Sequence, residues 1–404
     1  MIGSYKSKLL SVKIGSSVTS IGQNAFQTSS LLETAILSEN VTIIGDSAFR
    51  SCPQLTYINI PRSITYIGNM SFYNSGKLKR INIEDLSSWC RITFSNGNDA
   101  LSTAGHLYLN DTEITDLIIP NDIVTLKDNV FMYCYSLCSV TIPNNVTSVG
   151  SNVFYNCTNL VSVTIGTGLT SIGYYMFYNC SKLSTINIPN NITLIDSYAF
   201  YNCINLTSIT IPNSVTNIKN SAFSNCSGLT FIEIPNSVTS IPESAFHYCT
   251  KLSSVTLPNT ITSIGKWAFN NCTALTSIDI PSTVTNIGQY AFLDVPNVNY
   301  SGSATGSPWG AKYVNGYVEN GLVYTDSNKT NLVAASGNIQ NVVIPNSVIN
   351  IDSEIFYAGS SRFVYPGVIE KITCNNVVYN YDGSEYFTIL LNGSEVELHM
   401  WYLI

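Results

Sequence analysis

Eleven cysteines are the residues of this 404-residue chain that most readily suggest chemistry, either disulfide formation or metal binding. Eight of them recur three residues after a phenylalanine, without the Cys-x-x-Cys pairs or mixed cysteine–histidine clusters typical of zinc sites. Disulfides between neighbouring members of this row are the alternative, but a regularly stacked row cannot pair without distorting its rise. We therefore predict buried thiols that pack as small hydrophobic groups. The eight are Cys52, Cys134, Cys157, Cys180, Cys203, Cys226, Cys249 and Cys272.

Three further cysteines, Cys90, Cys138 and Cys374, lie off this row. They are the candidates for exposed thiols. An odd total of 11 cysteines also argues against complete disulfide pairing.

The histidines and carboxylates give little support to catalysis or metal binding. His106, His247 and His399 lie far apart, and no nucleophile elbow or comparable catalytic signature surrounds them. Asp111, Glu113 and Asp116 carry calcium-ligating groups but lack the spacing of a known loop, so a solvated turn is the better interpretation. Glycine-rich phosphate loops are missing. We therefore predict no catalytic, cofactor or metal site and a protein that is not an enzyme; hydrolysis through His106 or His247 is the alternative.

A repeat of 23 residues organises the chain. Two segments, Val146 to Ile165 and Ile192 to Ile211, follow one template with the same spacing of apolar residues. The repeated phenylalanine is separated from the next by 23 residues, except for gaps of 59 after Phe72 and 64 after Phe292. The anchors are Phe26, Phe49, Phe72, Phe131, Phe154, Phe177, Phe200, Phe223, Phe246, Phe269, Phe292 and Phe356.

Each repeat reads Leu-x-x-Ile-x-Ile-Pro-x-x-Val-x-x-Ile-Gly-x-x-Ala-Phe-x-x-Cys. The Ile-x-Ile alternation predicts a short strand with one buried face, which the proline ends. An Asp, Asn or Ser such as Asp46, Asp128 or Ser353 then suits a helix N-cap. The three-residue spacing in Ala-Phe-x-x-Cys-x-x-Leu predicts one or two short helical turns.

A single repeat cannot bury its own apolar side, whereas stacked repeats cover one another. We predict a strand-rich α/β fold: a right-handed leucine-rich-repeat solenoid with a parallel β-ladder on one side and short helical turns on the other. We divide this single solenoid into repeats at 1–83, an irregular insertion at 84–116 and repeats at 117–298. A second insertion at 299–341, a last repeat at 342–357 and a C-terminal cap at 358–404 follow, the cap including a hairpin around Asn392-Gly393.

The template resembles the BspA-like leucine-rich repeats, a class of bacterial and protozoan surface proteins. The agreement in period, Ala-Phe, Cys and Ile-Pro covers most of the chain. The resemblance implies an extracellular or cell-surface setting and an adhesion or recognition role, including binding to host matrix proteins. It is the only basis for that setting, because the first residues lack a secretion leader and no C-terminal anchor is visible.

Two surfaces of the predicted solenoid are candidates for ligand binding. Outward positions of the strands hold mostly Ser, Thr and Asn, and large or charged exceptions are better hot-spot candidates. On the opposite side, tyrosines on three successive repeats offer amphipathic contact area for a sugar or a protein. The strand-side candidates are Tyr57, Arg80, Phe231, Glu233 and Asp279, and the tyrosine row is Tyr155, Tyr178 and Tyr201.

Composition narrows the function further. The chain has 18 basic and 25 acidic residues, a net charge of −7, and only 11% charged residues, against roughly 25% in ordinary domains. Nucleic-acid binding is not expected without a basic stripe, and membrane insertion is not expected without a long apolar run. We predict a non-enzymatic recognition or adhesion protein that binds a protein or glycan and uses no cofactor. The alternative is a structural component, such as a virion or surface fibre, that associates with itself or a partner through a bare N-terminal edge around Leu9, Val12 and Ile14.

Overall fold

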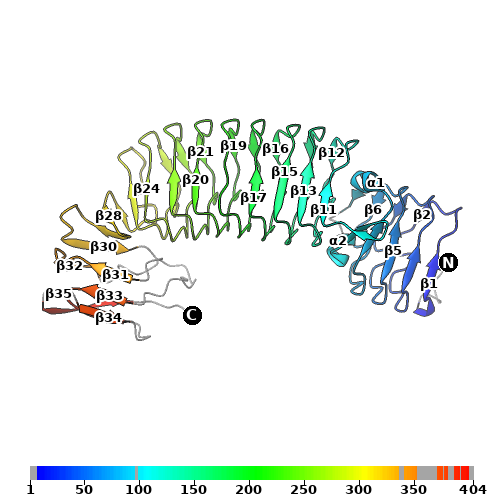
Figure 1. The fold of residues 1–404 in the computed structure, drawn as a ribbon, viewed down its shortest axis with the longest axis horizontal. Coiled ribbons are helices and arrows are strands. Elements are labelled where there is room, and N and C mark those ends of the chain that lie inside the picture. Colours follow the sequence, from blue (N-terminus) through cyan, green and yellow to red (C-terminus); the bar gives the residue numbers. More distant parts are fainter. Residues whose placement is uncertain are drawn as a thin grey trace. The chain divides into compact units, whose positions relative to one another are not determined.

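The computed structural model describes residues 7–95, 99–335, 341–352, 371–375, 377–380, 386–391 and 393–399. The predicted anchor Phe356 and the predicted cap Ser353 lie outside these residues. The chain forms two compact units, residues 1–215 and 216–404, which are described separately below. Both are strand-rich and built from stacked coils whose strands lie side by side (Figure 1).

The first unit carries a parallel ladder on its strand face, made by the predicted Ile-x-Ile segments. Register is strict, so that Val140 pairs with Val163 and Val163 with Ile186, one repeat apart each time. The strands are β1 (Ser11–Lys13), β3 (Thr34–Ile36), β5 (Tyr57–Ile60), β7 (Ile81–Ile83), β9 (Leu107–Leu109), β10 (Thr112–Glu113), β11 (Asp116–Ile118), β13 (Ser139–Ile142), β15 (Ser162–Ile165) and β17 (Thr185–Asn187). Among them only β10 runs antiparallel to its partner, β9.

A second set of two-residue strands follows the Val-x-x-Ile segments of the first unit. We call it the second ladder. It forms the sheets β2–β4–β6–β8 and β12–β14 and the pair β16–β18. The strands are β2 (Ser20–Ile21), β4 (Ile43–Ile44), β6 (Tyr66–Ile67), β8 (Thr93–Phe94), β12 (Thr125–Leu126), β14 (Ser148–Val149), β16 (Ser171–Ile172) and β18 (Leu194–Ile195).

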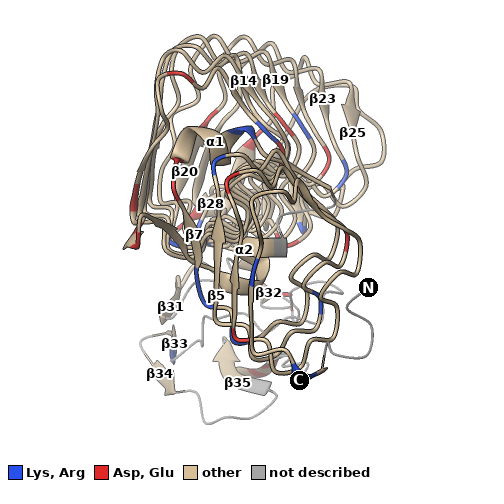
Figure 2. Cartoon of the chain, turned by 90° about the vertical axis from the view of Figure 1, so that its right-hand side faces the viewer, with Lys and Arg blue, Asp and Glu red and all other residues tan. Residues whose placement is uncertain are grey.

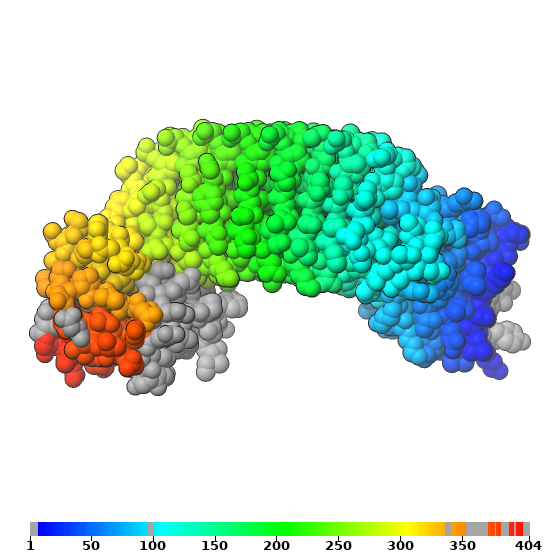
Figure 3. All heavy atoms as spheres, in the orientation of Figure 1, coloured from blue at the N-terminus to red at the C-terminus, as the bar shows by residue number. Residues whose placement is uncertain are grey.

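The core of each coil is the repeated phenylalanine. Phe154 and Phe177 are fully buried, with ring centroids 5.7 Å apart and planes 4° from parallel. Phe177 stacks in the same way on Phe200, at 5.6 Å. The space-filling view shows successive coils packed without a gap through residues 131–200 (Figure 3). Because the same side chain meets its own copy in the next coil, one apolar template fills the whole core.

The structure does not confirm the expected short helical turns around each phenylalanine. Asn152 and Asn156, two residues before and after Phe154, have left-handed φ angles of 58° and 60°. The N–H groups of Asn152, Phe154 and Asn156 donate to carbonyls of the next coil at 2.9, 3.0 and 2.7 Å. The alternate N–H groups bond along the chain, Tyr155 to Asn152 and Cys157 to Phe154, both at 3.2 Å. Because inter-coil and along-chain bonds alternate, the three-residue spacing reflects successive turns and not a continuous helix.

The predicted N-caps act between coils for the same reason. Asp46 Oδ1 accepts from the N–H of Asn69 at 2.8 Å, and Asp128 Oδ1 from that of Ser151 at 2.7 Å. In both pairs the donor stands at the same repeat position one coil later. These carboxylates therefore tie the stack together where helix capping was expected.

The α-helices in the described part of the chain lie between residues 84 and 116. They are α1 (Leu86–Arg91) and α2 (Asp99–Ala104). Asp85 caps α1 by accepting from the N–H of Ser88, as its position before the helix favours. Trp89 and Cys90 on α1 are buried.

The second unit is also built of stacked coils. Its strands are β19 (Asn217–Ile218), β20 (Phe231–Glu233), β21 (Ser240–Ile241), β22 (Ser254–Thr256), β23 (Ser263–Ile264), β24 (Ser277–Asp279), β25 (Asn286–Ile287), β26 (Asn297–Asn299), β27 (Tyr313–Val314), β28 (Tyr317–Glu319), β29 (Leu322–Tyr324), β30 (Asn331–Ala335), β31 (Asn341–Ile344), β32 (Asn350–Ile351), β33 (Lys371–Cys374), β34 (Val377–Asn380), β35 (Tyr386–Leu391) and β36 (Ser394–His399). The antiparallel pair β35–β36 is the hairpin expected around Asn392-Gly393. It contributes Ile389, Leu391 and Leu398 to a core cluster with Leu322, Tyr324 and Ile372.

Candidate binding surface

Charged residues are few and scattered along the coils (Figure 2). Two of the predicted strand-face residues, Tyr57 and Arg80, nevertheless lie together. Asn59 on β5 pairs with Asn82 on β7, so Tyr57 and Arg80, each two residues earlier in the chain, occupy the same repeat position; Arg80 immediately precedes β7. The guanidinium carbon of Arg80 lies 5.3 Å from the centre of the Tyr57 ring, within the range of a cation–π contact.

A second tyrosine, Tyr108 on β9, completes this cluster. Its ring centre lies 5.6 Å from the same guanidinium carbon, so Arg80 contacts two tyrosine rings. Arg80 also pairs with Asp111 at 3.7 Å, and the two side chains keep 41% and 67% of their surface exposed. Sequence reasoning missed Tyr108 because it lies in the irregular insertion, where no repeat template indicates which residues face outward.

His106 and Glu113 extend the cluster. His106 Nδ1 lies 2.6 Å from Glu113 Oε1. Glu113 stands opposite Tyr108 in the β9–β10 pairing. Burial first, and then the neighbouring Glu113 carboxylate, raise the pKa of Tyr108, so its hydroxyl remains a hydrogen-bond donor at neutral pH. We call Tyr57, Arg80, His106, Tyr108, Asp111 and Glu113 the strand-face cluster.

The three carboxylates weighed as calcium ligands have separate partners. Asp111 pairs with Arg80, Glu113 with His106, and Asp116 accepts from the Ser139 hydroxyl. Across the described residues, no group of three or more His, Cys, Asp or Glu side chains is placed to hold a metal ion.

The predicted tyrosine row forms a continuous stack. Ring centroids of Tyr155 and Tyr178 lie 4.6 Å apart and those of Tyr178 and Tyr201 4.7 Å apart, with planes within 4° of parallel. Tyr175 and Tyr198 form a parallel stack beside it, also at 4.7 Å. Because both faces of Tyr178 are covered, it presents its edge and hydroxyl to a ligand. A sugar ring cannot stack flat on it.

The remaining strand-face candidates belong to the second unit. Phe231 and Glu233 flank the buried Ile232 on β20 and are exposed, Phe231 to 43%. Asp279 on β24 is also exposed and accepts a hydrogen bond from Asn299 Nδ2 at 2.7 Å. Phe231 is therefore an exposed aromatic side chain on a strand with one carboxylate.

Of the other histidines, His247 packs against Tyr248 with ring centroids 4.3 Å apart. Burial lowers the pKa of His247, and a hydrogen bond with Asn270 opposes that shift in part. The side chain of His399 lies outside the described residues. His106 and His247 thus have different partners, the Glu113 carboxylate and the Tyr248 ring.

The cysteine row is buried, as predicted, and several of its thiols donate to a carbonyl of the preceding coil. Cys157, Cys180, Cys249 and Cys272 each place Sγ 3.2 Å from the carbonyl oxygen of the phenylalanine one coil earlier. None of the eleven cysteines forms a disulfide. Burial raises the pKa of Cys134 to about 11, so this thiol stays protonated and unreactive at neutral pH.

Two of the three cysteines off the row are not exposed, contrary to expectation. Cys90 is buried because it faces inward from α1 beside Trp89, and burial raises its pKa to about 12. Cys374 is buried in the core cluster of the second unit. Cys138, just before β13, is exposed as predicted.

The repeat has a known counterpart. The family profile described as "BspA type Leucine rich repeat region (6 copies)" matches residues 4–101, 103–230 and 224–301. The chain belongs to the BspA-type leucine-rich repeat family. The predicted resemblance is thereby confirmed. Stacked parallel coils with one apolar template are what this membership implies, and the structure has them.

Solved structures of bacterial leucine-rich repeat proteins are similar to this BspA-type chain. A protein from Bacteroides ovatus is 25% identical, with 76% of this chain and 82% of that one covered and a TM-score of 0.44. The pneumococcal vaccine antigen PcpA is 19% identical, with 76% and 80% covered and a TM-score of 0.43. A leucine rich cell surface protein from Faecalibacterium prausnitzii is 23% identical, with 61% and 79% covered and a TM-score of 0.30. No curated protein matches the chain.

Neither of the six-residue helices of this BspA-type protein nor any other helix in the described ranges has the length and hydropathy to cross a membrane.

Proposed function

We propose that this BspA-type repeat protein is a non-enzymatic recognition protein that binds a protein or glycan through the strand face of its first unit. The observation that carries the proposal is the position of Arg80, in contact with both Tyr57 and Tyr108 and paired with Asp111. Tyrosine and arginine dominate binding hot spots because they combine large contact area with directional hydrogen bonds. These contacts hold Arg80 before a ligand arrives, which lowers the entropic cost of binding.

The tyrosine row and Phe231 are secondary candidates. The stacked rings of the row offer hydroxyl groups and edges, which suits a protein partner better than a flat sugar ring. Phe231 lacks a neighbouring cation of the kind that Arg80 supplies to Tyr57 among the described contacts. We therefore place the main contact at the strand-face cluster.

The setting we propose is the cell surface or the extracellular space, with a host-surface or matrix molecule as partner. Membership of the BspA-type family supports this, as does the description of the similar Faecalibacterium prausnitzii structure as a cell surface protein. With 11% charged residues, binding would rest on many uncharged contacts and change little with salt. We also propose that the coils are right-handed, since about 98% of crossovers between parallel strands are.

The test is a binding screen against matrix proteins and glycans, repeated with single variants. We expect Arg80→Ala and Tyr57→Ala to weaken binding by about 10–100-fold, the loss typical of hot-spot truncation. Ser162→Ala on the same face is the matched control and should leave affinity within about twofold. Unchanged binding in both Arg80→Ala and Tyr57→Ala would contradict this assignment.

A structural role is the second proposal, supported by a specific edge. Within the described residues β1 pairs on one side only, with β3, and the adjacent Leu10 is 59% exposed. An unpaired strand edge with an exposed leucine favours association with another chain or another copy. Sedimentation should then show oligomers that Leu10→Lys reduces. A monomer at all concentrations would count against it.

A further inference from the structure

The second ladder of the first unit is interrupted between β8 and β12. β8 pairs with β6 and β12 with β14, and among the described residues no backbone hydrogen bond joins β8 to β12. β14 and β16 also belong to separate sheets, but within each sheet the coils are joined directly, for example by the N–H of Gly150 donating to the Leu126 carbonyl at 2.8 Å. At the interruption, each strand therefore leaves one backbone edge without a partner strand.

The cause is a missing strand. Between β7 and β11 along the chain, the strand face gains β9 and β10. The chain turns back from β9 into β10 and continues directly to β11, so it adds no strand to the second ladder there. The two ladders are consequently out of step, and the second one lacks a strand between β8 and β12.

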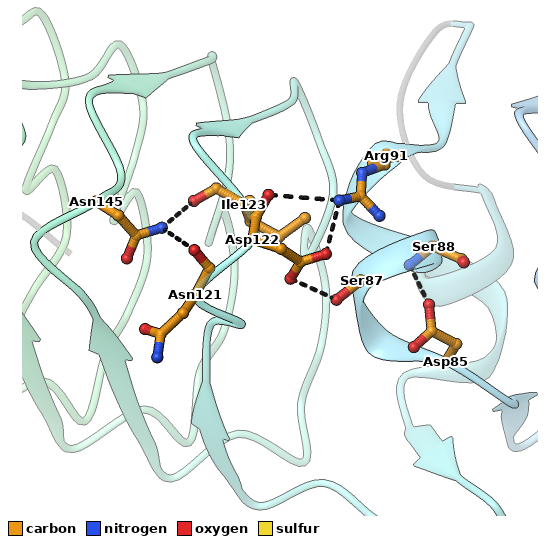
Figure 4. A network of polar contacts seen from close by, with 8 residues as sticks. All are labelled: Asp85, Ser87, Ser88, Arg91, Asn121, Asp122, Ile123 and Asn145. Carbon is orange, nitrogen blue, oxygen red and sulfur yellow. Dashed lines mark hydrogen bonds and ion pairs between the residues drawn. The ribbon is translucent and has the colours of Figure 1, made fainter.

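Side chains hold the two walls of this interruption in place. Arg91 and Ser87 of α1 both bond to the Asp122 carboxylate, at 2.6 and 2.8 Å (Figure 4). Trp89 Nε1 donates to the Val130 carbonyl at 3.0 Å in the buried interior. These contacts join α1 to the following coil where backbone bonds are absent.

A cleft of about 350 Å³ opens at this interruption and extends over β8, β12 and β14. Lys127 Nζ donates to the Thr93 hydroxyl at 2.9 Å at its margin. The cleft is lined by Thr93, Phe94, Thr125, Leu126, Lys127, Asp128, Ser148, Val149 and Gly150. Its lining is thus mainly hydroxyl and aliphatic, with one lysine beside one aspartate.

We propose that an extended peptide segment of a partner protein binds in this cleft as an added strand between β8 and β12. Its backbone would supply the donors and acceptors that the two edges lack, which is how strand addition gains affinity. Two-residue strands of this ladder consist of an exposed residue followed by a buried aliphatic one, as in Ser20-Ile21 and Thr125-Leu126. The expected peptide therefore carries an uncharged hydroxyl residue followed by isoleucine, leucine or valine. The cleft is distinct from the strand-face cluster, and this inference stands independently of the proposed function.

A suitable probe is a fluorescein-labelled peptide with the sequence of residues 260–266, Thr-Ile-Thr-Ser-Ile-Gly-Lys. It contains one two-residue strand with a hydroxyl residue followed by isoleucine, Ser263-Ile264. Fluorescence anisotropy should show saturable binding to the full chain. Ser148→Trp fills the cleft and should weaken binding at least about tenfold. Ser240→Trp is the matched control, at the same repeat position on β21 and equally exposed, and should bind as the unmodified chain does. Circular dichroism checks that both variants fold.

A peptide carrying Thr262→Pro separates strand addition from side-chain recognition. In the chain the Thr262 N–H donates to the Thr239 carbonyl of the preceding coil at 2.9 Å, and proline cannot donate such a bond. The proline peptide should bind at least about tenfold more weakly than the unmodified peptide. Three outcomes would each overturn the proposal. They are equal binding by the proline peptide, retained binding of the unmodified peptide to Ser148→Trp, and no saturable binding of the unmodified peptide to the full chain. A dimer of the chain that Ser148→Trp converts to a monomer would also overturn it, because the occupant would then be a second copy.

Discussion

The thiol of Cys180 lies 3.2 Å from the carbonyl oxygen of Phe154, one coil earlier in the stack. At the same repeat position Ser75 replaces cysteine, and its hydroxyl donates to the Phe49 carbonyl at 2.8 Å. The position therefore selects a small side chain that donates to the preceding coil. This explains why cysteine recurs there without forming disulfides.

The serine precedent predicts the response of Cys180 to substitution. Cys180→Ala removes the donor and leaves a small cavity, so we expect a loss of about 1–2 kcal/mol in the free energy of unfolding. Cys180→Ser keeps the donor and should lose less. Urea denaturation of the two variants measures the difference, and a serine variant less stable than the alanine variant would contradict this role.

Thiol accessibility should single out Cys138. It is the exposed cysteine, whereas the other ten are buried. Burial also keeps thiols such as Cys90, with a pKa of about 12, protonated at pH 7.5. Iodoacetamide should label Cys138 alone in the folded chain and all eleven thiols after unfolding, as read by mass spectrometry. Rapid labelling of Cys90 would show that α1 does not cover it.

The phenylalanine stack should be indispensable. Phe177 lies between Phe154 and Phe200 and is fully buried. Phe177→Ala should lower the free energy of unfolding by about 3–5 kcal/mol, because it opens a cavity between two stacked rings. Phe177→Leu keeps most of the volume and should cost less. A change below about 1 kcal/mol for the alanine variant would be incompatible with the stack.

Substitutions of Asn156 test whether the left-handed turns strain the backbone. Its φ is 60°, and its Nδ2 donates to the Tyr135 hydroxyl at 3.2 Å. Its Oδ1 accepts from Asn179 Nδ2. Asn156→Val adds a β-branched side chain where φ is positive and removes both bonds, so we expect a loss of about 2–3 kcal/mol. Asn156→Gly relieves the backbone strain and should lose less; thermal unfolding ranks the two, and the reverse order would refute the strain argument.

Stability should fall on mild acidification because of His247. Burial lowers its pKa below the ordinary value of 6.5, so the unfolded chain binds the proton more readily than the folded one. The contribution of neutral His247 to the free energy of unfolding is complete above pH 6.5 and is lost as the pH falls toward the lowered pKa. His247→Gln should therefore flatten the change in unfolding free energy between pH 7 and pH 5. An identical pH profile in the variant would show that His247 does not titrate with unfolding.

The 23-residue period by itself determined the stacking, the buried phenylalanines and the buried cysteine row. The physical reason is that in a repeat stack each side chain meets its own copy, so one template specifies every coil. The period could not distinguish helical turns from the turns seen around Phe154, since both space apolar residues by three. That choice depends on whether successive backbone N–H groups all bond along the chain or, as around Phe154, every second one bonds to the next coil.

Tertiary structure decided what happens where the template fails. Tyr108 and Cys90 lie in the stretch between Phe72 and Phe131, where no periodic position indicates their orientation. Folding brings Tyr108 to Arg80 and turns Cys90 inward from α1. The cleft between β8 and β12 likewise arises from two ladders that gain different numbers of strands. Such a mismatch exists only in three dimensions, because it depends on which segments pair.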